Sequence, residues 1–177
     1  GGYILLGAHG SDFSSTGDLF LVKIDGSGNE EWKKAIGGSG WDDGWNVQQT
    51  SDDGFIITGF TYSFAIGAFD IYVVKTNASG TVEWAKAYGG SGGENGRMIK
   101  QTNDGGYIIV GSTLSYGSGS SDLFLLKLLS NGDIDWFKTY GGSGNDWGYS
   151  ICQTGDNGFL ALGYTASFGS GSNDIFL

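Results

Sequence analysis

The stretch Gly105-Gly106-Tyr107-Ile108-Ile109-Val110-Gly111 decides the fold, because related heptads begin at residues 1, 53 and 157. Successive heptads are separated by steps of 52 residues, and the register never slips. Trp32, Trp84 and Trp136 keep the same step. A fixed period of this length indicates a tandem array of supersecondary units, of which the chain holds about 3.4. The repeat units run over 1–52, 53–104 and 105–156, with a partial unit over 157–177.

Each unit predicts four β-strands. In the third unit, two nearly continuous apolar runs cover 107–110 and 123–127, and they are rich in β-branched and aromatic residues. This composition is typical of strands buried on both faces. A third run centres on Trp136 and a fourth covers 149–153. No stretch shows a 3.6-residue periodicity, so we expect no helices.

Tight turns separate these runs. Asp53-Gly54, Asp104-Gly105 and Asn157-Gly158 are hairpin signals, in which we expect glycine to supply the positive φ. Further hairpins are expected at 77–80 and 130–133. Because hairpins join antiparallel strands, the repeat predicts an all-β fold built from four-stranded propeller blades. A parallel β-helix is the competing architecture, but its coils are usually shorter and do not reverse at Asp-Gly.

Composition excludes several classes of protein. Aromatic residues make up 15% and hydrophobic residues 39%, which is too rich for a disordered chain. A formal charge of −10 with 9 scattered Lys and Arg argues against a nucleic-acid partner. No apolar run approaches the roughly 20 residues of a membrane span, so we expect no membrane insertion. The single cysteine, Cys152, excludes an intrachain disulfide; on its apolar strand it is expected to be half-buried and inert.

The repeat also has a family resemblance. The segments GGYIIVG (105–111), DLFLLK (122–127), NGDIDW (131–136) and GGSGND (141–146) resemble the β-propeller repeats of bacterial and archaeal secreted or surface proteins, the SBBP-type repeats. They are similar, more distantly, to kelch-like and quinoprotein-like blades. The resemblance implies an extracellular or cell-surface protein. The cofactor ligands and adjacent-cysteine disulfide of quinoprotein dehydrogenases are not visible, so we expect no cofactor.

The analogy with kelch blades also orders the strands. It implies that the strand ending at Gln49-Thr50 is innermost and that the Trp-bearing strand is outermost. Two whole blades then lie near 45–88 and 97–140, while the run that ends at Leu177 is interrupted. Because a propeller needs at least about 4 blades to close, we expect further propeller repeats, or copies of this chain, to complete the array.

Residues that recur in every unit are expected to serve the fold. We expect the three repeated tryptophans to pack between adjacent blades. The aspartates that open one strand of each unit should accept backbone N–H groups from nearby loops; they are Asp18, Asp70, Asp122 and Asp174. The repeated Gly-Gly-Ser-Gly is expected to permit turns with positive φ. A phosphate-binding loop would need a following helix, whereas a strand follows here.

Candidate binding residues gather on one predicted face. Because strand directions alternate, the two longer connections of each unit share the face opposite the hairpins, which we call the longer-loop face. Aromatic rings can stack on sugar C–H faces while carboxylates accept sugar hydroxyls. The alternative is that these aromatics only cover the blade tops. The candidates are Trp41, Asp42, Asp43, Tyr62, Phe64, Glu94, Tyr116, Asp146, Trp147 and Phe168.

The sequence offers few residues that could form a catalytic site. A Ser/His/Asp triad would need His9, the single histidine, with Ser11 and Asp12, and Ser11 lacks the nucleophile-elbow context. The carboxylate pairs Asp42/Asp43 and Asp133/Asp135 are candidates for glycoside hydrolysis.

The sequence also offers one candidate calcium site and one candidate glycosylation site. Asn131, Asp133 and Asp135 alternate and offer oxygen ligands to calcium, although the EF-hand loop pattern is absent. Asn77-Ala78-Ser79 is the single N-glycosylation sequon and falls on a predicted hairpin.

The sequence therefore favours a non-catalytic extracellular scaffold or interaction module built from propeller blades. Three alternatives stay open: a lectin-like carbohydrate-binding propeller, a subunit of an extracellular filament or sheath, and a propeller enzyme such as a glycoside hydrolase.

Overall fold

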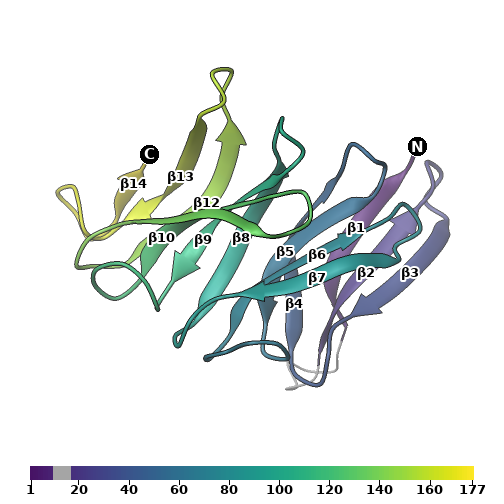
Figure 1. The fold of residues 1–177 in the computed structure, drawn as a ribbon, viewed down its shortest axis with the longest axis horizontal. Helices are drawn as coiled ribbons and strands as arrows, with labels where there is room; N and C mark the ends of the chain where they lie inside the picture. Colours follow the sequence, from purple (N-terminus) through teal and green to yellow (C-terminus); the bar gives the residue numbers. More distant parts are fainter. Residues whose placement is uncertain (10–16) are drawn as a thin grey trace.

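The computed structural model describes residues 1–9 and 17–177, and these residues form β-strands and turns (Figure 1). The all-β prediction is confirmed. The strands are β1 Tyr3–His9, β2 Asp18–Ile24, β3 Glu30–Ile36, β4 Asp42–Gln49, β5 Phe55–Thr61, β6 Asp70–Thr76, β7 Val82–Tyr88, β8 Glu94–Gln101, β9 Tyr107–Thr113, β10 Asp122–Leu128, β11 Ile134–Tyr140, β12 Asp146–Gln153, β13 Phe159–Thr165 and β14 Asp174–Phe176.

The strands form four antiparallel sheets, each with neighbours in chain order. Blade 1 is β1-β2-β3, blade 2 is β4-β5-β6-β7, blade 3 is β8-β9-β10-β11 and blade 4 is β12-β13-β14. The sheets follow one another as an open array of propeller-like blades, which is not closed into a ring. The two four-stranded blades span 42–88 and 94–140, so each begins three residues before its predicted start.

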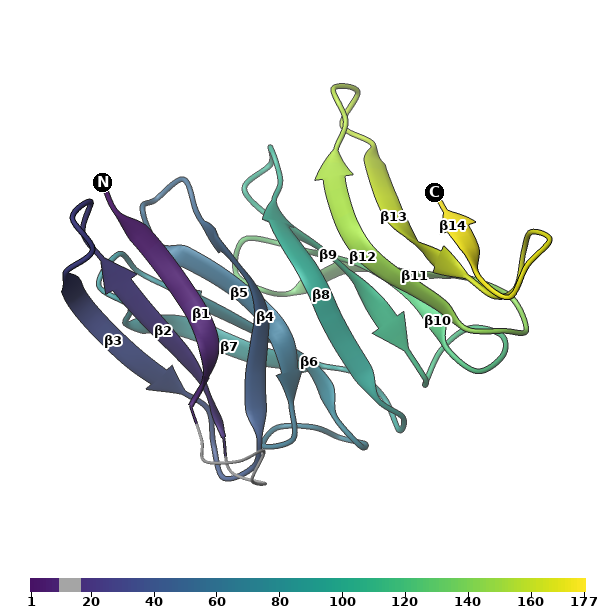
Figure 2. The ribbon, with the colours of Figure 1, turned by 180° about the vertical axis from the view of Figure 1, so that it is seen from behind.

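In blades 2, 3 and 4, the first strand lies at an inner edge. Strands β4, β8 and β12 run side by side in Figure 2 and contact one another. The tryptophan strands β3, β7 and β11 form the opposite edges of their sheets. This order confirms the strand arrangement implied by kelch blades.

The middle strands of blades 2 and 3 form the core. Every residue of β5, β6, β9 and β10 is buried, because each strand is covered by a neighbouring blade on both faces. This confirms the interpretation of the continuous apolar runs.

The repeated tryptophans link successive blades, as predicted. Trp32 of blade 1 meets Phe55 of blade 2 with ring centroids 5.9 Å apart. The equivalent pair Trp84–Tyr107 is also 5.9 Å apart, and the pair Trp136–Phe159 is 6.0 Å apart. Each contact buries large aromatic area at the same place in each junction.

The Gln-Thr motif adds a second link between blades. The side chain of Gln101 accepts a hydrogen bond from the backbone N–H of Ser51 in the preceding blade, at 2.9 Å. Gln153 accepts from Asn103 in the same way, at 3.0 Å. The glutamine therefore holds each β-hairpin turn against the next blade.

The hairpin glycines work differently from the prediction. At the same position of the repeat, the positive φ belongs to Asp53 (64°), Gly105 (80°) and Asn157 (65°). Two of the three turns therefore use Asp or Asn, which tolerate this conformation, and not glycine. Gly54 is needed for close approach, because a Cβ there would lie 2.2 Å from the carbonyl oxygen of Thr76.

Cys152 is exposed, so the prediction of a half-buried thiol is wrong. It lies opposite Leu160 on blade 4, and no further sheet covers this face within the described residues. Among those residues, no helix is long and apolar enough to cross a membrane.

Candidate functional site

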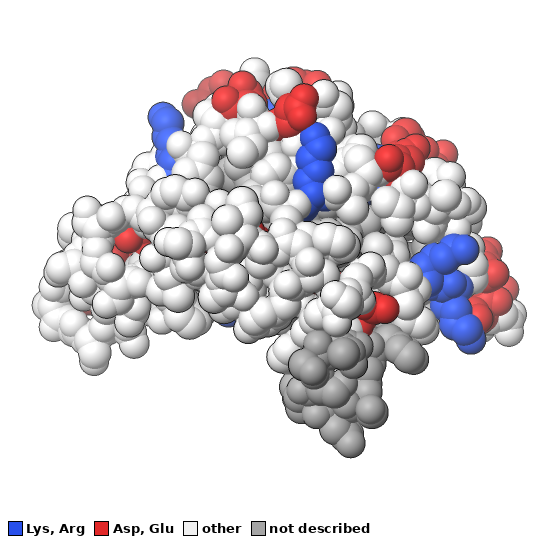
Figure 3. Space-filling model, turned by 60° about the horizontal axis from the view of Figure 1, so that its bottom comes forward, with Lys and Arg blue, Asp and Glu red and all other residues white. Residues whose placement is uncertain are grey.

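The longer-loop face is nearly free of exposed charge at its centre. Figure 3 views this end of the molecule, and its charged side chains lie mainly toward the upper and right-hand edges. Exposed apolar side chains rise from the loops that follow β5, β9 and β13: Tyr62, Phe64, Ile66, Leu114, Tyr116 and Phe168. The exposed surface at the centre of this face is therefore mainly apolar.

The carboxylates predicted for this face lie beneath it. Asp42 is fully buried, and its Oδ1 accepts a hydrogen bond from Thr61 Oγ1. Its Oδ2 accepts from the Gly38 N–H at 2.7 Å and from Ser63 Oγ at 2.6 Å. With both oxygens engaged, Asp42 ties the loop after β3 to the loop after β5.

Glu94 and Asp146 occupy the equivalent place in the next two repeats. Both side chains are fully buried. Glu94 accepts from the Gly90 N–H at 2.7 Å, and Asp146 accepts from the Gly142 N–H at 2.9 Å. Burial raises the pKa of Asp146, but hydrogen bonds from Ser167 and Gly142 to its Oδ2 help to bring that pKa below its usual value. The part of the hypothesis that assigned sugar hydroxyls to these three acids is therefore not supported.

The second row of aspartates caps the neighbouring loops, as predicted. Asp70 Oδ2 accepts the Ile66 N–H at 2.9 Å, and Asp174 Oδ2 accepts the Gly171 N–H at 3.2 Å. Asp70 is fully buried, and its Oδ1 has no hydrogen-bond partner among the described residues. Burial, followed by the nearby charge of Glu94, raises the pKa of Asp70 above its usual value.

The Gly-Gly-Ser-Gly segments separate these two rows of acids. A Cβ on Gly89 would lie 2.2 Å from Asp70 Oδ1 and 2.6 Å from Glu94 Oε2. A Cβ on Gly90 would lie 2.7 Å from the side chain of Ser115. Neither glycine has a positive φ. Glycine is required here by close approach, and the prediction that positive φ explains these segments is wrong for Gly89 and Gly90.

One aromatic cluster connects the longer-loop face to the inner edge of blade 2. Phe60 lies at its centre, with ring centroids 5.5 Å from Trp41 and 5.2 Å from Trp45. Trp41 and Tyr62 are stacked, with centroids 6.5 Å apart and planes 12° apart. Phe69 packs on Phe60 and Tyr62. The cluster is specific to this blade, because the residues that take the place of Trp41 in the next two repeats are Gly93 and Asn145.

A β-bulge interrupts the inner strand of each of blades 2, 3 and 4. The pairing of β4 with β5 skips Trp45, and the equivalent skips fall on Arg97 and Tyr149. A bulged residue lies outside the ladder, and its side chain is aimed away from the regular pleat. The repeat therefore presents a different side chain at each inner edge: indole, guanidinium and phenol.

These three side chains meet across the blades, and we call them the inner row. The guanidinium of Arg97 lies 3.9 Å from the ring centroid of Trp45 and 5.5 Å from that of Tyr149. It also lies 5.8 Å from the ring of Trp147. Tyr164 extends the row, with its ring 5.7 Å from Trp147. Cation–π attraction holds a guanidinium over such rings.

Arg97 is the single arginine of the chain, and within the described residues it forms no ion pair. Burial lowers the pKa of its guanidinium, but an arginine stays charged at neutral pH. The buried Nε of Arg97 and Nε1 of Trp147 have no hydrogen-bond acceptor in the described part of the chain. The inner row therefore combines one cation without an ion pair, aromatic rings and one unsatisfied donor, and a second unsatisfied donor lies beside it on Trp147.

The sequence-based candidates divide into three groups. Trp41, Tyr62 and Trp147 belong to the aromatic surfaces described here, while Phe64, Tyr116 and Phe168 are exposed on the loops. Asp42, Glu94 and Asp146 are buried beneath them, and Asp43 accepts a hydrogen bond from its own neighbour, Gly44, at 2.8 Å. Trp45, Arg97, Tyr149 and Tyr164 were missed; the change of residue type at one repeat position was the signal that could have identified the first three.

Among the described residues, the carboxylate pairs and the calcium candidates do not assemble into a catalytic or metal site. Asp42 is buried and Asp43 is partly exposed on the next position of the strand, so the two do not form a pair across a substrate. Asp133 receives the ammonium of Lys86 and the side-chain amide of Asn131, each at 2.8 Å, so its oxygens are already engaged. Across 1–9 and 17–177, no group of three acidic, His or Cys side chains has the geometry to hold a metal ion. The His9 side chain, Ser11 and Asp12 lie outside the described residues.

Asn77 lies in an exposed hairpin turn. Its Oδ1 accepts from the N–H groups of Ser79 and Thr81, both at 3.0 Å. The amide nitrogen that a glycan would modify is not used by these bonds. Glycosylation of Asn77 stays a prediction.

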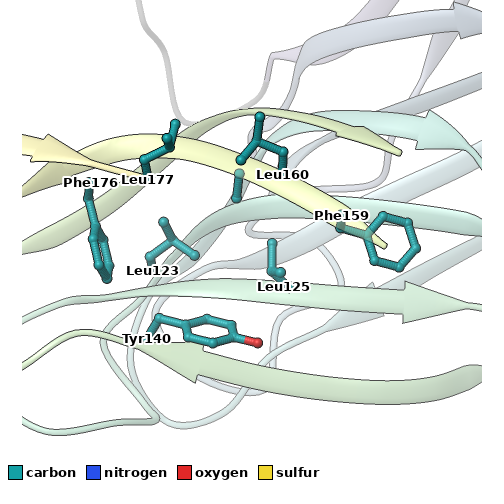
Figure 4. Close-up of a pocket in the computed structure, with 8 residues that line it drawn as sticks. Leu123, Leu125, Tyr140, Phe159, Leu160, Phe176 and Leu177 are labelled. Atoms are coloured by element: carbon teal, nitrogen blue, oxygen red, sulfur yellow. The ribbon is translucent and has the colours of Figure 1, made fainter. Parts of the chain in front are cut away.

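An apolar cavity lies between the last two blades. It measures about 230 Å³ and is lined by leucine and aromatic side chains of blades 3 and 4, including Leu123, Leu125, Phe159 and Phe176 (Figure 4). It offers no convergent polar groups and marks incomplete packing between two sheets. It therefore gives no reason to assign a polar ligand.

Comparison of the chain with protein-family models and with curated proteins finds no match.

Proposed function

We propose that this chain is a non-catalytic interaction scaffold whose two end faces are covered by further blades of the same repeat. The observation that carries the proposal is the exposure of junction residues at the ends of the array. Tyr3 is 64% exposed on blade 1, whereas its equivalents Phe55 and Tyr107 are 3% and 2% exposed within junctions. An extracellular or cell-surface location is part of this proposal and rests on the resemblance of the repeat.

The opposite end face supports the same proposal. Leu160 on blade 4 is 45% exposed, while its equivalents Ile56 and Ile108 are fully buried under the next blade. Ile175 is largely exposed, and its equivalent Ile71 is buried. Large exposed apolar patches mark interaction surfaces. The two faces are the two halves of a junction that already occurs three times within the array, so the matching occupant of each is another blade of this type.

Contact between such faces is head-to-tail. The blade 1 face of one copy would pack on the blade 4 face of another, as blade 3 packs on blade 2. A heterologous contact of this kind leads to a closed ring or an open filament. Further blades in a longer chain and separate copies of this chain would use the same two faces.

Sedimentation velocity with two complementary variants tests the proposal. We expect Tyr3→Glu and Leu160→Glu each to disable one face and to sediment as monomers, because a charge would be buried in the contact. A mixture of the two variants should form a dimer, since each retains the face that the other lacks. Ile66→Glu is the matched control, because Ile66 is exposed on the longer-loop face and should leave association unchanged.

The alkylation rate of Cys152 gives an independent readout. The thiol lies on the blade 4 end face, so association should slow its reaction with iodoacetamide as protein concentration rises. A wild-type chain that stays monomeric at high concentration, with a constant alkylation rate, would contradict the scaffold proposal.

Carbohydrate binding is a second candidate, favoured by the stacked Trp41–Tyr62 pair beside a face with few exposed charges. The substitution Trp41→Ala should abolish binding of a neutral oligosaccharide detected by calorimetry. Tyr140→Ala is the control, because Tyr140 is an exposed aromatic residue on the outer strand β11. Unchanged binding by Trp41→Ala would remove this site.

A further inference from the structure

We propose that the inner row, formed by Trp45, Arg97 and Tyr149, is a subsite for the carboxylate of an acidic sugar residue in a glycan. The inference rests on the carbohydrate-binding function proposed above and names its substrate class.

The cation is the first part of the argument. In a chain of net charge −10, Arg97 is the single arginine, and no carboxylate pairs with it among the described residues. Five of the lysines have carboxylate partners: Lys23, Lys33, Lys75, Lys86 and Lys127. A planar guanidinium matches a carboxylate with two parallel hydrogen bonds, so Arg97 is suited to this anion.

The unsatisfied donors are the second part. Arg97 Nε and Trp147 Nε1 are buried without acceptors, and the guanidinium lies 5.8 Å from the Trp147 ring. Both N–H groups are closed to solvent, so a ligand carboxylate would meet the partly exposed remainder of the Arg97 side chain, whose charge no acceptor among the described residues offsets.

The surrounding rings favour a sugar over an acidic peptide. Tyr149 is 43% exposed beside Arg97, and the Trp45 ring connects through Phe60 to the stacked Trp41 and Tyr62. Phe60 is buried, so sugar units would stack on the exposed rings at the two ends of this sequence, Tyr149 at the inner edge and Tyr62 on the longer-loop face. The bulges make the arrangement possible, because they direct side chains from three different blades toward one another.

Isothermal titration calorimetry with a matched pair of ligands tests the proposal. The acidic probe is trigalacturonate, and the neutral probe is its trimethyl ester. We expect the wild-type chain to bind the acid about tenfold more tightly than the ester, because a charge-assisted pair adds to the stacking. This preference should weaken as salt is added.

Variants of Arg97 identify the group responsible. Arg97→Gln should remove the preference for the acid and leave the affinity for the ester unchanged, while Arg97→Lys should give an intermediate preference because it keeps the charge without the planar fork. Lys138→Gln is the matched control, since Lys138 also lies near an aromatic ring, 5.8 Å from Trp136, but on the outer strand. Thermal unfolding of each variant checks the fold, and Arg97→Lys serves if Arg97→Gln does not fold.

Three results would overturn the inference while leaving carbohydrate binding in place. The wild-type chain could bind acid and ester with equal affinity, or Arg97→Gln could keep the preference for the acid. Triglutamate could also bind as tightly as trigalacturonate and depend on Arg97 in the same way. The last would assign the site to acidic peptides. Failure of both sugars to bind would overturn the carbohydrate-binding function and this inference together.

Discussion

Asp70 and Asp42 are both fully buried carboxylates, yet we expect the same substitution to change stability in opposite directions. Asp70 Oδ1 has no partner in the described chain and faces Glu94 Oε2 across Gly89. In Asp70→Asn, the amide oxygen keeps the hydrogen bond from Ile66, and an amide N–H replaces the unpaired Oδ1 on the side of Glu94. The change therefore removes a like-charge interaction and a buried carboxylate oxygen that has no partner.

The expected gain follows from the cost of a buried group without a partner. Such a group costs about 1–3 kcal/mol, so Asp70→Asn should raise the free energy of unfolding by about 1–2 kcal/mol at pH 7. For a chain of this size that corresponds to an increase in Tm of about 2–8 °C.

The gain should disappear in acid. The folded-state pKa of Asp70 is raised above the unfolded value of 3.8, so its ionisation destabilises the fold at higher pH. Below pH 3.8 the carboxyl is protonated in both states, and this penalty is absent. The difference in Tm between Asp70→Asn and the wild type should therefore shrink as pH falls from 7 toward 3.8.

Asp42→Asn supplies the contrast. The Gly38 N–H can only donate, so the amide oxygen must face Gly38 and Ser63, and the amide N–H then replaces the charged oxygen that accepts from Thr61. This variant should lose about 1.5–3 kcal/mol. Differential scanning calorimetry of both variants from pH 7 to pH 3.5 measures these changes in Tm. A lower Tm for Asp70→Asn than for the wild type at pH 7, or a change of Tm in the same direction for both variants, would refute the assignment.

Three further predictions concern the junctions and the hairpins. Trp84→Ala should lower the free energy of unfolding by about 3–5 kcal/mol, measured by urea denaturation, because it empties the contact with Tyr107; a loss no larger than that of the exposed control Tyr140→Ala would contradict this. Monomeric protein should react fully at Cys152 with iodoacetamide without denaturant, as mass spectrometry would show; resistance of the folded monomer would exclude an exposed thiol. Hydrogen bonds from Thr50 and Lys75 hold the pKa of Asp52 at about 2, and those from Thr102, Gly106 and Lys127 hold that of Asp104 at about 2. Their stabilisation is complete above pH 3.8 and is lost as pH falls toward 2, so the double variant Asp52→Asn/Asp104→Asn should flatten the dependence of the urea midpoint on pH; an unchanged slope would contradict the assignment.

The local sequence pattern was sufficient to predict the strands and their order within the blades. The continuous apolar run at 107–110 requires cover on both faces, and a 52-residue period supplies that cover from identical neighbours. Trp84 could be assigned to a junction for the same reason, since a residue needed in every unit is explained by contacts that every unit makes.

The sequence pattern could not predict features that depend on contacts between residues distant in the chain. Gly54 is next to the residue with positive φ, and its role depends on the carbonyl of Thr76, which is distant in sequence. Asp42 follows a glycine-rich loop, which predicts an exposed side chain. The loop after β5 nevertheless covers Asp42, and Ser63 of that loop donates a hydrogen bond to it. Arg97 was missed because a register shift of one residue, which the sequence does not mark, turns its side chain toward the inner edge.

The bulge on each inner strand has a consequence for how such an array can diverge. A residue inside the ladder must suit two neighbouring sheets, whereas the bulged position is exempt from backbone pairing in its own blade. A substitution at this site changes the side chain that meets the neighbouring blade but leaves the ladder of its own blade intact. Trp, Arg and Tyr at this site show that one position per repeat can diverge in residue type while the strand pairing is inherited unchanged.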